Sequence, residues 1–267
     1  MQREELLREI DGNRDLIEER CRLTPEQAET LDRHYRLTNT FTSNAVEGNR
    51  FSLQDVKLVL EDGISVGGKT LRDLFETIFH AKAFDTILKT ARENSTDFVS
   101  ESLLDIISGL HRTFYEFIDR KYAGVYRDVR VMITGARTVL PPPDMLETFM
   151  DGFRDSFARH ADAMHPVRLA AFAHLRFVQI HPYVDGNGRI ARLLTNFVLV
   201  NRGYQIINVG EDSLSQYYDT LDRAETQDDD DNEFLDLFTR LELNAQKEFM
   251  RLNNMECPGP VPPTRSS

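Results

Sequence analysis

The stretch His181-Pro-Tyr-Val-Asp-Gly-Asn-Gly-Arg-Ile-Ala-Arg192 combines a histidine, an aspartate, a Gly-Asn-Gly turn and two arginines. On either side lie two segments, Val167–Ile180 and Arg189–Arg202, that are apolar nearly all round. Such segments are typical of helices buried at the centre of a domain. The second helix would begin directly after the glycine turn, where free backbone N–H groups and the helix dipole favour an anion. The stretch therefore predicts a helical core built around an anion-binding helix start.

The turn itself suits a phosphate group. The backbone amides of Gly186, Asn187 and Gly188 can approach phosphate oxygens closely, because glycine has no Cβ and tolerates unusual backbone angles. Arg189 and Arg192 follow on one helix face, where each guanidinium can add charge-assisted bonds to further phosphates. The turn and the two arginines predict a polyphosphate site. It is not a Walker loop, because no Gly-x-x-x-x-Gly-Lys-Ser/Thr occurs.

Two residues ahead of the turn supply groups for chemistry. Asp185 offers a hard oxygen ligand for Mg²⁺, which commonly binds one or two carboxylates plus substrate phosphates. His181 can take a proton from an incoming hydroxyl. Either residue alone has a commoner structural explanation, but their place between two buried helices favours a reactive site. A zinc pair is disfavoured, since no further Cys or His ligands cluster nearby.

Composition narrows the class of protein. The chain has 267 residues and a formal net charge of −12, which argues against nonspecific binding to nucleic acid or to an acidic membrane. Its two cysteines, Cys21 and Cys257, lie far apart, as expected in a reducing compartment rather than in a disulfide framework. No apolar run approaches membrane-spanning length. We therefore expect a soluble cytoplasmic protein that binds neither nucleic acid nor membrane.

Helical signals dominate the rest of the chain. The sequence Thr24-Pro25-Glu26-Gln27 is a capping box with proline at the first helical position, and the pattern then runs to Gly48. Further helices are expected from Ser52 to Gly63, from about Thr70 through Arg92, from Ser100 to about Ile118, and after a cap at Asp144. The fold class predicted from these signals is all-α, with one exception.

The exception is Val129–Leu140, which has the pattern of a small β-hairpin. Its valines and isoleucine alternate up to a turn at Gly135-Ala136, and Val139-Leu140 returns before three prolines. A lone hairpin is marginal in water unless another element packs on it or pairs with it.

The twelve-residue stretch resembles the signature of the Fic family, His-Pro-Phe-x-Asp/Glu-Gly-Asn-Gly-Arg-x-x-Arg, with Tyr183 in place of phenylalanine. The resemblance implies a mostly helical fold and the transfer of AMP from ATP to a protein hydroxyl. It further implies these roles: His181 as the base, Asp185 as the Mg²⁺ ligand, Gly186–Gly188 as the anion hole, and Arg189 and Arg192 as holders of the β- and γ-phosphates.

Two further regions resemble parts of the family. Gly124-Val-Tyr-Arg127 and the Val129–Leu140 hairpin look like the flap that covers the nucleotide site, whose free edge can pair with an extended stretch of a protein target. Tyr218 resembles a tyrosine that borders the adenine. Glu225 stands where an adenine-contacting asparagine is frequent, which leaves the base specificity open.

The segment Ser43-Asn-Ala-Val-Glu47-Gly48-Asn49 resembles the family's inhibitory motif. Ser43 and Glu47 are four residues apart, so they share a helix face. In regulated relatives this glutamate reaches the second arginine of the signature, which here is Arg192. A carboxylate on Arg192 would take the place of the γ-phosphate. Some relatives also use this glutamate to remove AMP.

The leading hypothesis is an autoinhibited adenylyltransferase that moves AMP from Mg·ATP to a Ser, Thr or Tyr hydroxyl of a protein, including itself. The alternatives are an enzyme that mainly removes AMP or transfers another phosphate-linked group, and a nucleotide-sensing interaction module. We expect an N-terminal helical region with the inhibitory motif at 1–69, a catalytic core at 70–255 and a disordered tail at 256–267. The sequence leaves a homo-oligomer open.

Overall fold

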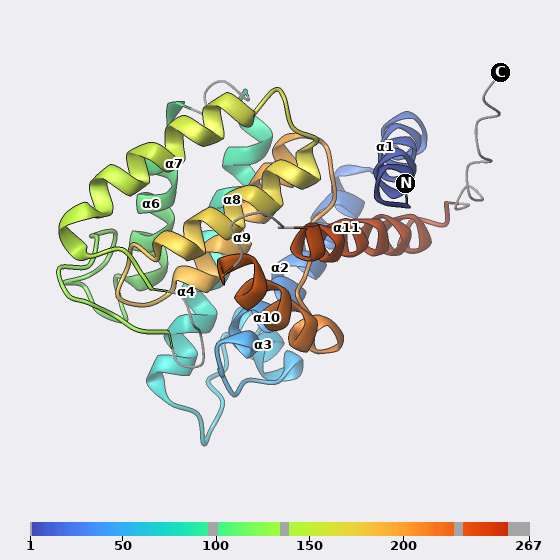
Figure 1. Ribbon diagram of the computed structural model, residues 1–267. Coiled ribbons are helices and arrows are strands. Elements are labelled where there is room, and N and C mark those ends of the chain that lie inside the picture. The colour runs from blue at the N-terminus through green and yellow to red at the C-terminus, as the bar shows by residue number, and fades with distance from the viewer. Residues whose placement is uncertain (1, 96–100, 134–138, 227–231, 256–267) are drawn as a thin grey trace.

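The computed structural model describes residues 2–95, 101–133, 139–226 and 232–255, and its regular elements over these residues are all helices (Figure 1). The α-helices in chain order are α1 (Gln2–Arg20), α2 (Pro25–Val46), α3 (Leu53–Leu60), α4 (Leu71–Glu93), α6 (Leu103–Tyr115), α7 (Leu146–His160), α8 (Pro166–Ile180), α9 (Asn187–Asn201), α10 (Glu211–Thr226) and α11 (Asn232–Leu252). A short 3₁₀ helix, η1 (Pro143–Met145), precedes α7. The prediction of a mostly helical chain is confirmed.

Helices α8 and α9 form the centre of the molecule, as their apolar sequences predicted (Figure 1). Every residue of α9 from Ile190 to Leu199 is buried. Helix α4 packs on α9, and α11, α7 and α10 pack on α8. The start of α9 is therefore fixed in space by neighbours on several sides, which lets it serve as a rigid support for a site.

Helices α1 to α3, which the sequence places in an N-terminal region, pack onto the rest of the chain. Helix α1 lies beside α11, and α2 packs on α4 and also contacts α9 and α10 (Figure 1). Among the described residues, no helix is both long enough and apolar enough to cross a membrane. The predicted tail at 256–267 lies outside the described residues.

The predicted helix starts are present where side chains supply the caps. Thr24 accepts from the Gln27 amide and the Gln27 side chain accepts from the Thr24 amide, which completes the expected capping box. Ser52 and Thr70 cap α3 and α4 in the same reciprocal way. Asp144 does not cap the next helix, because it lies inside η1 and α7 begins at Leu146.

The predicted hairpin at Val129–Leu140 is not present in the described residues. Residues 129–133 and 139–140 form no strand, and the predicted turn, 134–138, lies outside the part that the structure describes. The backbone carbonyls at the two ends of this segment bond instead to one side chain, since Arg127 donates to Val129 (3.1 Å) and to Pro141 (2.6 Å). Met132 is 94% exposed, so its side chain finds no apolar surface that would stabilise a lone hairpin.

Candidate active site

The loop between α8 and α9 has a backbone that few residues adopt. His181 ends α8 in the left-handed conformation with φ 51°, and Gly186 begins α9 with φ 82°. A histidine with positive φ is uncommon, and residues in sparsely populated regions cluster at functional sites. Glycine at position 186 meets the second requirement without strain.

Asn187 and the ring at position 183 hold this loop together. The Tyr183 amide donates to Asn187 Oδ1 (3.0 Å), and Asn187 Nδ2 donates back to the Tyr183 carbonyl (2.9 Å). The ring of Tyr183 is fully buried and stacks on His111 with centroids 3.7 Å apart. Its hydroxyl has no hydrogen-bond partner among the described residues. The side chain of Asn187 is therefore used for structure, and its backbone amide remains part of the predicted anion hole.

Burial sets the protonation state of His181. It removes water from the ring and lowers the pKa of His181 to about 4, with Arg127 adding to the effect. The ring is therefore neutral at physiological pH, as a general base must be before it accepts a proton. The backbone carbonyl of His181 accepts a bond from Arg127 Nε at 2.8 Å. Arg127 thus connects the histidine to both ends of the 129–141 segment.

Asp185 is held as a carboxylate by donors on three sides. Burial alone would raise the pKa of Asp185, but Arg189, the Gly186 amide (2.6 Å) and Arg72 together lower it. No group of three or more His, Cys, Asp or Glu side chains is arranged for a metal within the described residues. A single ionised carboxylate beside an anion site still fits Mg²⁺, because phosphate oxygens and water complete its shell.

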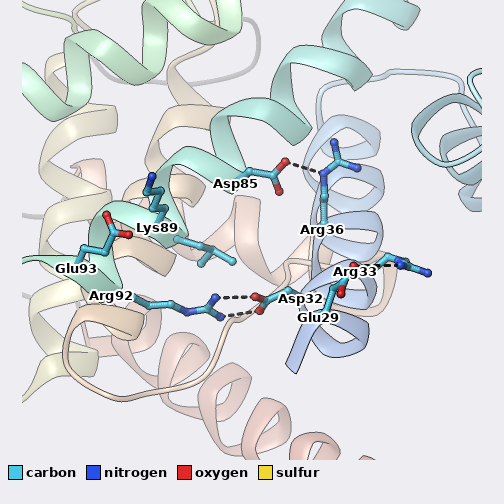
Figure 2. A pocket seen from close by; sticks show the side chains of 9 residues that line it. Glu29, Asp32, Arg33, Arg36, Asp85, Lys89, Arg92 and Glu93 are labelled. Atoms are coloured by element: carbon cyan, nitrogen blue, oxygen red, sulfur yellow. Dashed lines mark hydrogen bonds and ion pairs between the residues drawn. The ribbon is translucent and has the colours of Figure 1, made fainter. Parts of the chain in front are cut away.

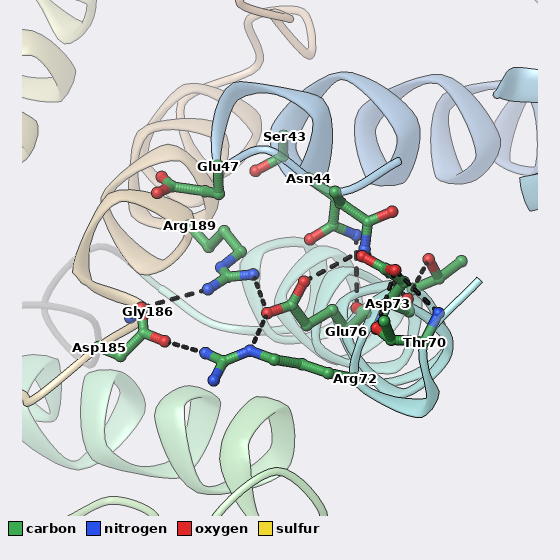
Figure 3. A network of polar contacts seen from close by, with 12 residues as sticks. Ser43, Asn44, Glu47, Thr70, Arg72, Asp73, Glu76, Asp185, Gly186 and Arg189 are labelled. Atoms are coloured by element: carbon green, nitrogen blue, oxygen red, sulfur yellow. Dashed lines mark hydrogen bonds and ion pairs between the residues drawn. The ribbon is translucent and has the colours of Figure 1, made fainter. Parts of the chain in front are cut away.

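The two arginines of the motif are both occupied by carboxylates. Arg189 is 2% exposed and lies between Glu76 (3.0 Å) and Asp185 (3.3 Å) (Figure 3). Its guanidinium lies over the ring of Phe114. Arg192 Nη2 donates to Glu47 Oε1 at 2.8 Å. Each guanidinium therefore has a carboxylate where a phosphate is predicted to bind.

Ser43 and Glu47 meet Arg192 together. Arg192 Nε donates to Ser43 Oγ (2.9 Å), and Nη2 donates to the Ser43 carbonyl (2.8 Å) as well as to Glu47. The Glu47 carboxylate lies so close to Gly188 that a Cβ at that position would collide with it. The absence of a side chain at Gly188 is thus what allows an acid to reach the start of α9.

Tyr218 and its neighbour have different surroundings. Tyr218 is 47% exposed and its hydroxyl donates to the carbonyl of Val46 at 2.9 Å, at the end of α2 and directly before Glu47. Tyr217 is buried, and its hydroxyl bonds to His174 Nε2 at 2.9 Å. His174 is fully buried and is the core histidine that its position suggests. The side chain of Glu225 lies outside the part that the structure describes.

Sequence reasoning missed three residues that shape the site, Arg72, Glu76 and His111, and it gave Arg127 only as part of the flap-like region, without its contacts to His181. His111 Nδ1 accepts from the Gly124 amide (2.9 Å), so Nε2 carries the proton and donates to the Asp185 carbonyl (3.1 Å). Arg72 and Glu76 are four apart on α4, a spacing that signals an ion pair but not its partners elsewhere. Their roles depend on contacts that only the fold creates.

A surface cavity of about 480 Å³ lies elsewhere, between α2 and α4 (Figure 2). Its charged side chains pair with one another, as Arg36 does with Asp85 (2.8 Å) and Arg92 with Asp32 (2.6 Å). Because these charges are already matched across the cavity, it does not compete with the start of α9 as the reactive site.

Comparison with known sequences agrees with this geometry. Residues 101–199 match the sequence profile described as "Fic/DOC family". A protein adenylyltransferase Fic of Nematostella vectensis is 29% identical over 223 residues, which cover 83% of this chain and 50% of that protein. One of Culex quinquefasciatus is 33% identical over 193 residues, covering 72% and 37%. The chain thus spans half or less of the length of these relatives.

Solved structures share the fold. A Fic domain containing signaling protein from Bacteroides thetaiotaomicron superposes with a TM-score of 0.79 at 26% identity, covering 95% of this chain and 99% of that one. Fic-1 from C. elegans gives a TM-score of 0.81 at 23% identity, covering 94% and 73%, which is a likeness of fold. Together with the His181–Arg192 motif at the start of α9, these matches show that the chain carries a domain of the Fic/DOC family.

Proposed function

We propose that this chain is an autoinhibited protein adenylyltransferase, which moves AMP from Mg·ATP to a Ser, Thr or Tyr hydroxyl of a protein, including itself. The observation that carries the proposal is the contact of Arg192 with the Glu47 carboxylate (2.8 Å) at the start of α9, in a motif whose His181 is kept neutral by burial. Relatives named protein adenylyltransferase Fic support the same activity. In this reading residues 1–69 carry the inhibitory helix and 70–255 the catalytic core.

His181 would act as the general base of the transfer. Its neutral ring accepts the proton of the target hydroxyl, whose oxygen forms a bond to the α-phosphorus of ATP while the bond to the β-phosphate oxygen breaks. Pyrophosphate leaves, and the amides of Gly186–Gly188 with Arg189 and Arg192 stabilise its charge. Asp185 would hold Mg²⁺, which neutralises charge on the phosphates.

Glu47 would restrain this reaction by occupying Arg192. Its carboxylate lies against Gly188, at the start of the helix whose amides are predicted to bind phosphate. A γ-phosphate and this carboxylate cannot share the same guanidinium donors, so ATP binds weakly or in a pose whose α-phosphate is not in line with the hydroxyl. Release of Glu47 then restores the site.

The protein target would approach along the 129–141 segment. Arg127 ties both ends of that segment to His181, and Met132 and Val139 within the segment are exposed. A flap at this place would bring an extended target chain to the base. Tyr218, half exposed near the end of α2, would border the adenine. The free thiol of Cys21 suits the cytoplasm, and a homo-oligomer is compatible with all of this.

AMP removal is the second candidate, because the Glu47 carboxylate lies within the anion site and a carboxylate there can orient a water molecule. Intact mass spectrometry separates the candidates. Glu47→Gly protein incubated with Mg·ATP should gain the mass of AMP, and unchanged protein should not. Faster loss of AMP from a pre-modified protein with Glu47 present than with Gly would favour removal. If the protein binds ATP but neither it nor a supplied target gains mass, an interaction module is favoured. If mass is gained from a nucleotide other than ATP, the transferred group is not AMP.

A further inference from the structure

Four charged side chains form a closed ring beside the start of α9 (Figure 3). Arg72 contacts Asp185, Asp185 contacts Arg189 (3.3 Å), Arg189 contacts Glu76 (3.0 Å), and Glu76 contacts Arg72 (3.0 Å). Two positive and two negative groups alternate, so the ring is neutral as a whole. Arg72 and Glu76 come from α4, whereas Asp185 and Arg189 belong to the motif.

The members of the ring differ in how firmly they are held. The side chains of Arg189 and Glu76 are 3% and 8% exposed, and Glu76 also accepts a bond from Asn49 Nδ2 (3.2 Å). The side chain of Arg72 is 55% exposed. Displacement of Arg72 therefore costs the least free energy among the four, because water can accept hydrogen bonds from its donors.

The contact between Arg72 and Asp185 involves the oxygen that the motif leaves free. Asp185 Oδ1 already accepts from the Gly186 amide and from Arg189, and Oδ2 accepts from Arg72 Nη2. A divalent cation at this carboxylate and the Arg72 guanidinium carry the same sign of charge and need the same oxygen. The two occupants exclude each other.

We propose that Arg72 is a positioning residue that occupies the Asp185 carboxylate and thereby sets its affinity for a divalent cation, with Glu76 as its fixed anchor. The inference rests on the proposed metal-binding role of Asp185. Glu76 keeps Arg72 beside the site through Nε after the cation has displaced Nη2. Arg72 can then return when the cation leaves.

Substitutions of Arg72 and of Glu76 should shift the affinity for the cation in opposite directions. Arg72→Met frees Asp185 and leaves the remaining three charges net negative, so a cation should bind more tightly. Glu76→Gln removes the second carboxylate that shares Arg72 and leaves the remaining charges net positive, so a cation should bind more weakly. A general loosening of the fold would not produce opposite shifts.

Manganese(II) alone is the probe, because its paramagnetism broadens nearby amide signals in NMR spectra of the full ¹⁵N-labelled chain. We expect the Mn²⁺ concentration that half-broadens the Gly186 and Gly188 signals to fall about threefold in Arg72→Met, which is the scale of a partly exposed ion pair. The concentration should rise in Glu76→Gln. Arg50→Met is the matched control, since Arg50 pairs with Asp73 at 3.4 Å and does not belong to the ring.

The Asp185→Asn variant distinguishes a failure of the proposed role of Arg72 from a failure of the proposed metal-binding role of Asp185. Broadening that Asp185→Asn abolishes, but that Arg72→Met shifts no more than Arg50→Met does, contradicts the role of Arg72 and leaves the proposed function intact. Broadening that persists in Asp185→Asn contradicts the metal role of Asp185 and the inference with it, whereas broadening that is absent from the Arg72→Met protein contradicts the inference.

Discussion

Arg192 and Glu47 are 145 residues apart in the chain, yet Nη2 of the arginine lies 2.8 Å from Oε1 of the glutamate. The guanidinium is almost fully buried, and Ser43 supplies two further acceptors. A buried arginine of this kind needs a full set of partners, because an unpaired buried charge is costly. Removal of Glu47 therefore leaves the buried guanidinium without its carboxylate partner, and a phosphate can bind in that place.

Ser43→Ala should release the restraint in part. The change removes the bond from Arg192 Nε but leaves the Ser43 carbonyl and Glu47 in place. A hydrogen bond to a charged group contributes about 1.5–3 kcal/mol, so AMP incorporation should rise by less than in Glu47→Gly. Initial rates with labelled ATP measure this. Thr42→Ala is the control, because its hydroxyl bonds within its own helix and to Asn208. Equal rates for Ser43→Ala and Thr42→Ala would remove Ser43 from the restraint.

Arg127→Met should slow transfer without weakening nucleotide binding. The guanidinium holds the His181 carbonyl and both ends of the 129–141 segment through hydrogen bonds to backbone carbonyls. Its loss should lower kcat at least tenfold in the Glu47→Gly background, as expected for a displaced base (about 1.4 kcal/mol per tenfold). The Kd for ATP should change less than twofold. Arg127→Lys should recover only part of the rate, since it lacks the planar fork. A matching loss of ATP affinity would contradict the assignment.

The rate of AMP transfer should persist to a lower pH than a solvent-exposed histidine base would allow. Burial lowers the pKa of His181 to about 4, so the fraction of neutral base should stay high as the pH falls through 6.5. A pH–rate profile of the Glu47→Gly protein under single-turnover conditions, with ATP saturating, checks this. Loss of half the rate near pH 6.5, with ATP binding unchanged, would show that the ring is solvated during catalysis.

The same burial should make the fold sensitive to acid. The pKa of His80, His111 and His174 is lowered by burial, as is that of His181. A depressed folded-state pKa means that the unfolded chain takes up protons first, so the free energy of unfolding falls as the pH drops from about 6.5 towards 4. Thermal unfolding across this range should show a falling Tm. A Tm that is level between pH 6.5 and 4.5 would contradict the burial of these rings.

Glu242→Gln should stabilise the protein at neutral and alkaline pH. Glu242 is fully buried, and burial raises its pKa to about 8. A raised folded-state pKa favours folding below the unfolded pKa, and this advantage is lost as the pH rises towards 8. Glutamine keeps an acceptor for the Gln205 amide and carries no charge. The Tm should therefore rise by a few degrees at pH 8, at about 2–4 °C per kcal/mol, and change little at pH 4.5. A lower Tm at pH 8 would indicate an ionised, compensated Glu242.

Local sequence signals predicted the helices and the His181–Arg192 motif of the candidate site. Thr24 with Gln27, and the glycine turn before Asn187, act within a few residues, so the printed sequence contains their partners. The Glu47–Arg192 contact was accessible only through resemblance to a family motif, because nothing local joins residues so far apart. Local pattern was misleading at Val129–Leu140, where alternation predicted strands and Arg127 holds the described ends instead.

The ring of Arg72, Glu76, Asp185 and Arg189 could not be predicted from the sequence for a related reason. Arg72 reaches Asp185 across 113 residues, and its sequence neighbourhood shows only an ordinary i,i+4 pair with Glu76. Which groups such a pair meets depends on how α4 packs against α9. Long-range charge networks therefore become visible only when the packing of the helices is known.

The most direct test of the roles of His181 and Glu47 compares the initial rate of AMP incorporation in four proteins: the unchanged chain, Glu47→Gly, His181→Ala and the double variant. With labelled Mg·ATP, we expect a low rate for the unchanged chain, a rate at least tenfold higher for Glu47→Gly, and background for both proteins that lack His181. Incorporation by the double variant at the Glu47→Gly rate would contradict the role of His181 as the base, and equal rates with and without Glu47 would contradict the restraint.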